Sequence, residues 1–319
     1  MPIVDQPTIG GAGPSFPEGA MAHFRTIAIL LAILAAAPVV AQQDFSAVEI
    51  ETVKVADNVY VLIGSGGNVG LSVGSDGAFL VDDQYAPLSD KIRRAISEVT
   101  QDDVRFILNT HWHGDHTGGN ENFAQQGAVI VAHDNVRKRM QVEQFVPLFD
   151  HRAPPAPEGA LPVVTFSETA TFHWNGKTIH AFHVQTAHTD GDAIIRFEED
   201  DIFHMGDIYW TSGYPRIDVG NGGSVDGVIR AVDAVLAIAT DDSRIIPGHG
   251  PLPPPGLSGL RSYAEMLKGI RDEVRTLIDE GLSEDEVIAA RPTRRFDSEW
   301  EGGRSPDSFT QIVYRSLLE

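Results

Sequence analysis

The chain has 319 residues, 42% of them hydrophobic, which is enough for one large core and at most two compact domains. Its net charge of −21 opposes binding to phosphodiester backbones, so we expect no nucleic-acid partner. The lack of cysteine in the sequence excludes disulfides, lipoprotein attachment and thiolate metal ligands.

The amino-terminal segment has the pattern of an export signal. Arg25 precedes an apolar run from Ile27 to Ala37, and Val39-Val40-Ala41 offers small residues for cleavage. The stretch from Ile27 to Ala41 has 15 residues, fewer than the roughly 18 expected of a membrane-spanning helix. We therefore expect residues 1–41 to be an extension plus signal peptide, and the product to be periplasmic or secreted without stable membrane insertion. An uncleaved membrane anchor is the alternative.

Hydrophobic periodicity predicts a series of strands and helices after this segment. The expected strands of the first half are residues 48–55, 59–63, 70–73, 78–81, 104–109 and 128–132. Helices are expected over residues 88–99, directly after residue 116, and over 135–144. Residues 145–162 contain five prolines and are too long for a tight turn, so they are expected to form a flap beside a pocket.

The second half repeats this order of elements. Strands are expected over residues 163–165, 171–174, 178–184, 193–197, 202–204 and 244–246, and a helix over 225–239. This alternation predicts an α/β fold of two mixed sheets with helices on their outer faces.

The pattern changes to helix near the carboxyl end. Residues 251–255 are rich in proline and are expected to form a linker. Beyond them, Leu260, Tyr263, Leu267 and Ile270 mark one apolar face of a helix. We expect residues 42–256 to form a catalytic domain and residues 257–319 a helical extension packed on it; an arm that contacts substrate or a second subunit is the alternative.

The most informative motif is His111-Trp112-His113-Gly114-Asp115-His116, which directly follows a predicted strand. Imidazole nitrogens and carboxylate oxygens are the ligands that hold Zn²⁺ in proteins. Alternating positions on an extended backbone can aim His111 and His113 at one ion. Asp115 and His116 lie beyond them, where a loop passes into a helix start. The motif therefore predicts a metal site, and a second metal is plausible.

This hexapeptide resembles the His-x-His-x-Asp-His signature of the metallo-β-lactamase superfamily. Three further motifs follow in the order seen in that family: Ala187-His188-Thr189, Gly206-Asp207, and Pro247-Gly248-His249-Gly250. The resemblance extends from about residue 48 to residue 250. It implies an αββα sandwich, with the ligands at strand ends along one edge.

The resemblance also implies a ligand set and a mechanism. His111, His113 and His188 would bind one metal, Asp115, His116 and His249 the other, and Asp207 would bridge them. The expected metals are two Zn²⁺ ions, with iron or manganese as alternatives. A hydroxide held between them would attack the substrate, and Asp115 would act as both ligand and proton acceptor.

Other residues near the ligands are expected to have supporting roles. Asp82 matches an early aspartate of the family and is expected to accept the ring N–H of a ligand histidine; a helix-capping turn is the alternative. Tyr209, Trp210 and Tyr214 leave from Asp207 and are expected to contact the substrate, unless they only anchor the loop on the core. Further histidines within predicted strands, His180, His183 and His204, are expected to be structural.

The expected function is a di-zinc hydrolase that opens a cyclic amide or ester, a small molecule such as a β-lactam or lactone. A thioesterase similar to hydroxyacylglutathione hydrolases is the first alternative. Its substrate is cytosolic, which the export signal argues against. A mono-iron sulfur dioxygenase and a non-catalytic metal-binding protein are alternatives of other classes. Weak lactam turnover is expected because Trp210 stands where some lactamases have a carboxylate-binding lysine.

Overall fold

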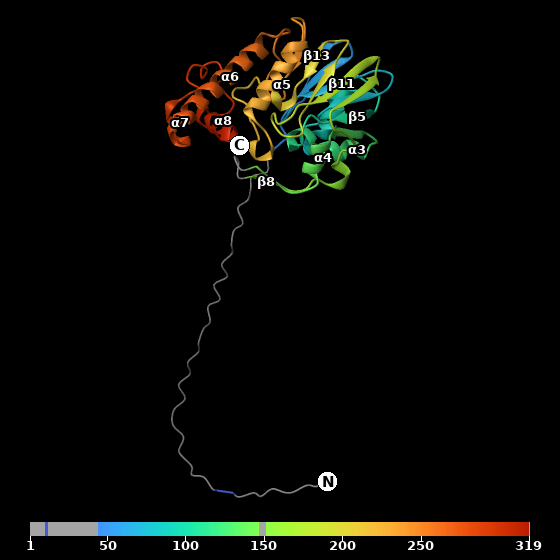
Figure 1. The fold of residues 1–319 in the computed structure, drawn as a ribbon. Helices are drawn as coiled ribbons and strands as arrows, with labels where there is room; N and C mark the ends of the chain where they lie inside the picture. The colour runs from blue at the N-terminus through green and yellow to red at the C-terminus, as the bar shows by residue number, and fades with distance from the viewer. Residues whose placement is uncertain (1–9, 12–43, 147–150, 319) are drawn as a thin grey trace. The chain divides into compact units, whose positions relative to one another are not determined.

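The computed structural model describes residues 10–11, 44–146 and 151–318. The predicted export segment lies almost entirely outside these residues. Residues 44–319 form one compact unit (Figure 1). In the parts of the chain that the structure describes, none of the helices combines the length and apolar character needed to cross a bilayer.

The first sheet is mixed and is built largely from the first half of the chain. Its seven strands lie in the order β1-β2-β3-β4-β5-β6-β9, with antiparallel pairs up to β4 and parallel pairs from β4 to β9. The strands are β1 (Glu51–Ala56), β2 (Val59–Ile63), β3 (Val69–Ser72), β4 (Ala78–Val81), β5 (Val104–Leu108), β6 (Val129–His133) and β9 (Val164–Phe166).

The second sheet comes from the second half and is also mixed. Its order is β10-β11-β12-β13-β14, in which only the last pair is parallel. The strands are β10 (Thr169–Trp174), β11 (Lys177–His183), β12 (Ala193–Phe197), β13 (Ile202–His204) and β14 (Arg244–Ile246). The prediction of two mixed sheets is therefore confirmed.

Helices cover both outer faces. On the first sheet lie α1 (Ser89–Ser97) and α3 (Asn120–Ala124), because Ile92, Ile96 and Phe123 pack on the outward side chains of its strands. On the second sheet lies α5 (Val225–Ile238), which buries Val228, Val232 and Val235. A separate apolar cluster fills the space between the sheets. The layers are thus helix, sheet, sheet and helix, the predicted αββα sandwich.

The carboxyl-terminal region is helical, as its periodicity predicts. It contains α6 (Ser258–Asp279), α7 (Glu284–Ala290) and α8 (Pro306–Leu318). Figure 1 shows α5 between the sheets and these helices. Tyr263, Leu267 and Ile270 of α6 share one buried cluster with α5, so the extension and the sandwich have a continuous core.

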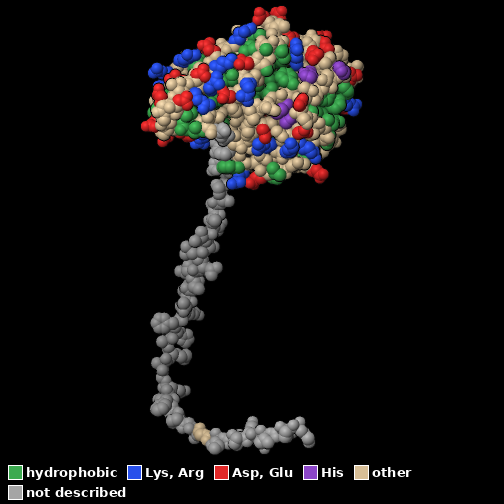
Figure 2. Space-filling view, in the orientation of Figure 1, with side chains coloured by type: hydrophobic (Ala, Val, Ile, Leu, Met, Phe, Trp, Pro, Cys, Tyr) green, Lys and Arg blue, Asp and Glu red, His purple; other side chains and the backbone are tan. Residues whose placement is uncertain are grey.

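The segment after β6 differs most from the expectation. The helix predicted over residues 135–144 is shorter, α4 (Asp134–Met140), and is followed by a hairpin of β7 (Gln144–Val146) and β8 (His151–Ala153). A 3-10 turn at Glu158–Ala160 follows. The proline-rich flap thus carries local secondary structure, which its composition did not reveal. On the face in Figure 2, acidic and basic side chains are interspersed over the compact unit.

Candidate metal centre

The histidine-rich motif is placed by the end of β5. His111 and His113 lie on the chain that leaves this strand, and His113 has extended dihedral angles as the residue before α2 (Gly114–Thr117). Asp115 and His116 lie in the first turns of α2. The change from extended chain to helix directs the two pairs of side chains to different points, because helix and strand orient successive side chains differently.

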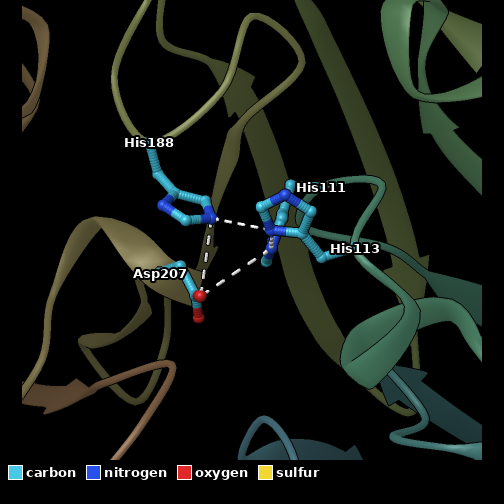
Figure 3. Close-up of side chains that lie close together, drawn as sticks. All are labelled: His111, His113, His188 and Asp207. Atoms are coloured by element: carbon cyan, nitrogen blue, oxygen red, sulfur yellow. Dashed lines mark hydrogen bonds and ion pairs between the residues drawn. The ribbon is translucent and has the colours of Figure 1, made fainter. Parts of the chain in front are cut away.

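Four side chains converge in a first cluster: His111, His113, His188 and Asp207. Nδ1 of His113 lies 3.1 Å from Nε2 of His111 and 2.9 Å from Nε2 of His188. Figure 3 shows the three rings and the carboxylate pointing toward one another. His188 comes from the loop between β11 and β12, and Asp207 from a 3-10 turn after β13.

A second cluster lies beside the first: Asp115, His116 and His249. Nε2 of His249 lies 3.2 Å from Nε2 of His116 and 3.3 Å from Oδ2 of Asp115. Asp207 faces both clusters. Its Oδ1 lies 3.0 Å from Nε2 of His116 and 3.3 Å from Nε2 of His249, while its Oδ2 lies 3.5 Å from Nε2 of His188. The structure therefore brings together all seven residues that the sequence singled out as ligands.

The chemistry of these donors fits divalent metal ions. Histidine nitrogen and carboxylate oxygen are the preferred zinc ligands. Oδ1 of Asp207 is buried and makes no hydrogen bond, although two imidazole nitrogens lie close to it. Glycines make room for the ligands, because a Cβ at Gly67 would collide with the His116 ring and one at Gly248 with Asp207.

Electrostatics keep two histidines of the first cluster neutral. Burial, and then the charge of His116, lower the pKa of His111 well below its ordinary value. Burial lowers the pKa of His188 to about 4. Neutral imidazoles are the form that coordinates metal, so these ligands need lose no proton near neutral pH.

In the second cluster the pKa values of both histidines are raised instead. Burial disfavours the charged rings of His116 and His249, but neighbouring carboxylates, Asp207 foremost, raise the pKa of His116 well above its usual range and that of His249 to about 9. Burial opposes ionisation of Asp115, yet His116 and His249 lower the pKa of that carboxyl. A metal at this cluster therefore has to displace protons.

Three outer contacts fix the ligand rings. Oδ2 of Asp82 accepts from Nδ1 of His116 at 2.7 Å, the contact expected of Asp82. Asp218, which is 3% exposed, accepts from Nε2 of His113 at 2.9 Å. The backbone carbonyl of Arg216 accepts from Nδ1 of His188 at 2.8 Å. Asp218 was not predicted, because its loop has no local signal that places it beside the ligands.

A cavity of about 440 Å³ opens beside the clusters. Its walls include aromatic and aliphatic side chains, a cation and two of the ligand residues: Tyr85, Trp112, Val146, Ala153, Arg216, His113 and Asp115. A volume in this range suits a small-molecule substrate.

The aromatic residues after Asp207 lie differently from the expectation. Tyr209 and Tyr214 are each 1% exposed and belong to the hydrophobic core, where Tyr209 packs on Tyr263 and Tyr214 stacks on Phe309. The carboxyl-terminal helices cover these two tyrosines, and this burial argues against the expectation that they contact the substrate. Trp210 is half-buried and stacks on the His249 ring with centroids 4.3 Å apart.

The strand histidines are outside both clusters. His204 is buried and hydrogen-bonds the carbonyl of Asn68 at 2.9 Å. His180 bonds the Thr171 hydroxyl, and His183 bonds the carbonyl of Asp192. Their contacts are structural, as expected from their positions inside strands.

Solved structures of known proteins share this fold. A DIM-1 metallo-beta-lactamase aligns at 17% identity over 69% of this chain and 98% of its own, with a TM-score of 0.55. A metallo-beta-lactamase from Pontibacter korlensis aligns at 17% identity over 69% of this chain and 99% of its own, with a TM-score of 0.56. The sec-alkylsulfatase Pisa1 from Pseudomonas sp. aligns at 15% identity over 84% of this chain and 50% of its own, with a TM-score of 0.62.

The sequence itself gives a family assignment. No curated protein sequence matches this chain significantly. Residues 62–249, which are more than half of the chain and span all seven clustered residues, match the family model of the metallo-beta-lactamase superfamily. The chain therefore belongs to the metallo-beta-lactamase superfamily.

Proposed function

We propose that this protein is an exported di-zinc hydrolase that opens a cyclic amide or ester, such as a β-lactam or a lactone. The observation that carries the proposal is the position of Asp207, whose two carboxylate oxygens face two separate clusters of histidine and aspartate. Two bound zinc ions would supply Lewis-acid polarisation and a water that is nucleophilic near neutral pH.

Each clustered residue would have a defined role in metal binding or proton transfer. One ion would be held by His111, His113 and His188, and the other by Asp115, His116 and His249. Asp207 would bind both ions. Asp115 also lines the cavity, so its carboxylate would lie beside the attacking water as ligand and proton acceptor. Asp82, Asp218 and the Arg216 carbonyl hold the rings in the required orientation.

The cavity supports a small, partly apolar substrate. Tyr85, Trp112 and Val146 offer apolar surface, and Arg216 also lines the cavity. Arg216 is a cation suited to a substrate carboxylate, so the cavity has a positive group even though Trp210 replaces the lysine of some lactamases. Export is proposed from the apolar segment between Arg25 and Ala41.

The test is a substrate panel on the purified protein, with metal content measured on the same sample. The panel contains nitrocefin, a γ-lactone, a glutathione thioester and a secondary alkyl sulfate. We expect about two zinc ions per chain, and kcat/KM for a ring-containing substrate above that for the thioester or the sulfate. His111→Ala is the inactive control. A single tightly bound iron, or preference for the thioester, would contradict the proposal.

Cellular location needs a separate experiment. Fractionation followed by amino-terminal sequencing is expected to find a periplasmic or secreted chain that begins near Gln42. An intact chain in the cytosol would instead favour the thioesterase alternative, because glutathione thioesters are made there.

A further inference from the structure

Arg139 joins four segments of the chain although it touches none of the metal-ligand residues. Its Nε and Nη2 donate to the two carboxylate oxygens of Asp190 at 3.1 and 2.7 Å. Its Nη1 donates to Oδ1 of Asn221 at 2.8 Å and to Oε1 of Gln144 at 3.0 Å. Helix α4, the loop of His188, the loop of Asp218 and strand β7 therefore meet at one guanidinium.

One branch of these contacts ends at a metal ligand. Nδ2 of Asn221 donates to both carboxylate oxygens of Asp218, at 3.0 and 2.9 Å. Asp218 in turn accepts from Nε2 of His113. That bond leaves the Nδ1 lone pair of His113 facing His111 and His188. Arg139 is thus three hydrogen bonds away from the imidazole it would orient.

The other branch ends at the cavity wall. Asn221 also donates to the carbonyl of Phe145 at 3.2 Å, and the Gln144 amide donates back to the carbonyl of Arg139 at 2.9 Å. Both contacts hold β7, whose last residue, Val146, lines the cavity. One side chain therefore fixes a ligand ring and the wall beside it.

We propose that Arg139 is a positioning residue for the metal ligand His113, acting through Asn221 and Asp218. The proposal rests on the proposed metal-dependent function. Asn221 and Asp218 are 2% and 3% exposed, so their bonds are not in competition with bulk water. A planar guanidinium can hold Asp190 with one edge and Asn221 with the other, which an ammonium cannot do.

Arg139→Met tests this, because methionine keeps much of the length and removes every donor. Arg137→Met is the matched control: Arg137 lies on the same helix but donates to the carbonyl of Pro162, outside the network. Arg139→Lys tests whether charge alone suffices. Asp218→Ala and the double variant Arg139→Met with Asp218→Ala complete a double-mutant cycle.

Two quantities are measured for each variant. The Co²⁺ affinity of each cluster is measured by visible absorption in competition with a chelator, and thermal stability is measured on the same samples. Arg139→Met is expected to weaken Co²⁺ at the three-histidine cluster about threefold to tenfold, below the roughly 10- to 100-fold loss for a direct outer partner. In Arg139→Met, the Co²⁺ affinity of the cluster of Asp115, His116 and His249 should change less than about twofold, and in Arg137→Met the affinity of both clusters should change equally little. Arg139→Lys should not restore the Co²⁺ affinity of the three-histidine cluster.

In the double-mutant cycle, adding Arg139→Met to Asp218→Ala should weaken Co²⁺ binding by less than about a further twofold, because without Asp218 no hydrogen bonds connect Arg139 to His113. The proposal would be overturned if the losses of Co²⁺ affinity in Arg139→Met and Asp218→Ala multiply in the double variant, or if Arg139→Met weakens Co²⁺ binding equally at both clusters. Restored binding in Arg139→Lys would overturn it as well.

A metal-free readout separates this proposal from the proposed function. Nitrogen-15 spectra of the His113 ring in the metal-free protein should show one tautomer with the proton on Nε2 in the wild type, and a mixture in Arg139→Met. If the wild type binds no Co²⁺, the proposed function fails, and the tautomer still decides the positioning role. An unchanged tautomer would contradict it.

Discussion

Oδ2 of Asp82 lies 2.7 Å from Nδ1 of His116, and both side chains are fully buried. The same carboxylate accepts from the backbone N–H and the hydroxyl of Thr110, each at 2.7 Å. Asp82 has a φ of 64°, a conformation that asparagine and aspartate tolerate better than other side chains. The buried carboxylate therefore orients His116 from a backbone that few residues could adopt.

Asp82→Asn should keep the backbone and remove the charge behind His116. We expect the metal at the cluster of Asp115, His116 and His249 to bind about 10- to 100-fold more weakly, as for other outer partners of ligand histidines. Chelator titration measures this. Asp76→Asn, on an exposed turn, is the control. Unchanged affinity in Asp82→Asn would show that this contact does not tune the ligand.

Asp207→Ala should loosen the metal bound by His249 more than the metal bound by His188. The Oδ1 atom of Asp207 lies 3.3 Å from His249 Nε2, and the other cluster keeps three histidines when the carboxylate is removed. Metal analysis after dialysis against a graded chelator series measures both losses. Equal loss of the two metals, or no loss, would argue against a bridging carboxylate.

Metal affinity should depend on pH differently at the two clusters. In the metal-free protein the pKa of His249 is raised to about 9 and that of His116 is raised well above its usual range, so this cluster holds protons at pH 7. Metal must displace these protons, and affinity at this cluster should fall by about one to two decades per pH unit between pH 8 and 6. His188, with its pKa lowered to about 4, gives no such dependence at the other cluster. Calorimetry in buffers of different ionisation enthalpy counts the released protons; none released would refute the assignment.

Trp210→Ala should weaken the metal held by His249. The indole stacks on the His249 ring, and its Nε1 donates to the carbonyl of Asp207 at 2.9 Å. Losing both contacts frees the imidazole, so we expect a loss of about threefold to tenfold, consistent with about 1 kcal/mol for an aromatic pair. Trp210→Phe keeps a stacking surface and should lose less. If both variants bind metal like the wild type, Trp210 has no role in holding His249.

Tyr214→Phe should lower stability and leave KM unchanged. The Tyr214 hydroxyl lies 3.0 Å from Oδ1 of Asp297 and 3.3 Å from the carbonyl of Thr293, in the turn segment between α7 and α8, and can donate to either oxygen. Its loss should cost about 0.5 to 1.5 kcal/mol of the free energy of unfolding. Urea titration gives the first quantity and steady-state kinetics the second. A raised KM would show that Tyr214 reaches the substrate after all.

The order of elements could be predicted because each depends on local pattern. β4, β12 and β13 are apolar runs bounded by turn residues, and their predicted ranges agree with the structure. The motif from His111 to His116 was also recognisable, since closely spaced histidines and an aspartate after a buried strand signal a metal site without knowledge of the tertiary contacts. The ligands His188, Asp207 and His249 were found only through the resemblance to the metallo-β-lactamase superfamily. The hairpin of β7 and β8 was missed, because strand pairing depends on a partner segment that proline content does not reveal.

Contacts between distant segments were decided only by the tertiary structure. Asp218 and His113 are 105 residues apart, and nothing in the loop around Asp218 indicates which ring it will meet. Tyr209 and Tyr214 follow a ligand in sequence, yet the extension buries them, because large aromatic side chains gain more from apolar packing than from exposure. Sequence pattern determined the element types and the donor chemistry, which follow from each residue's own properties. The folded chain determined which side chains meet, because that depends on packing among elements far apart in the sequence.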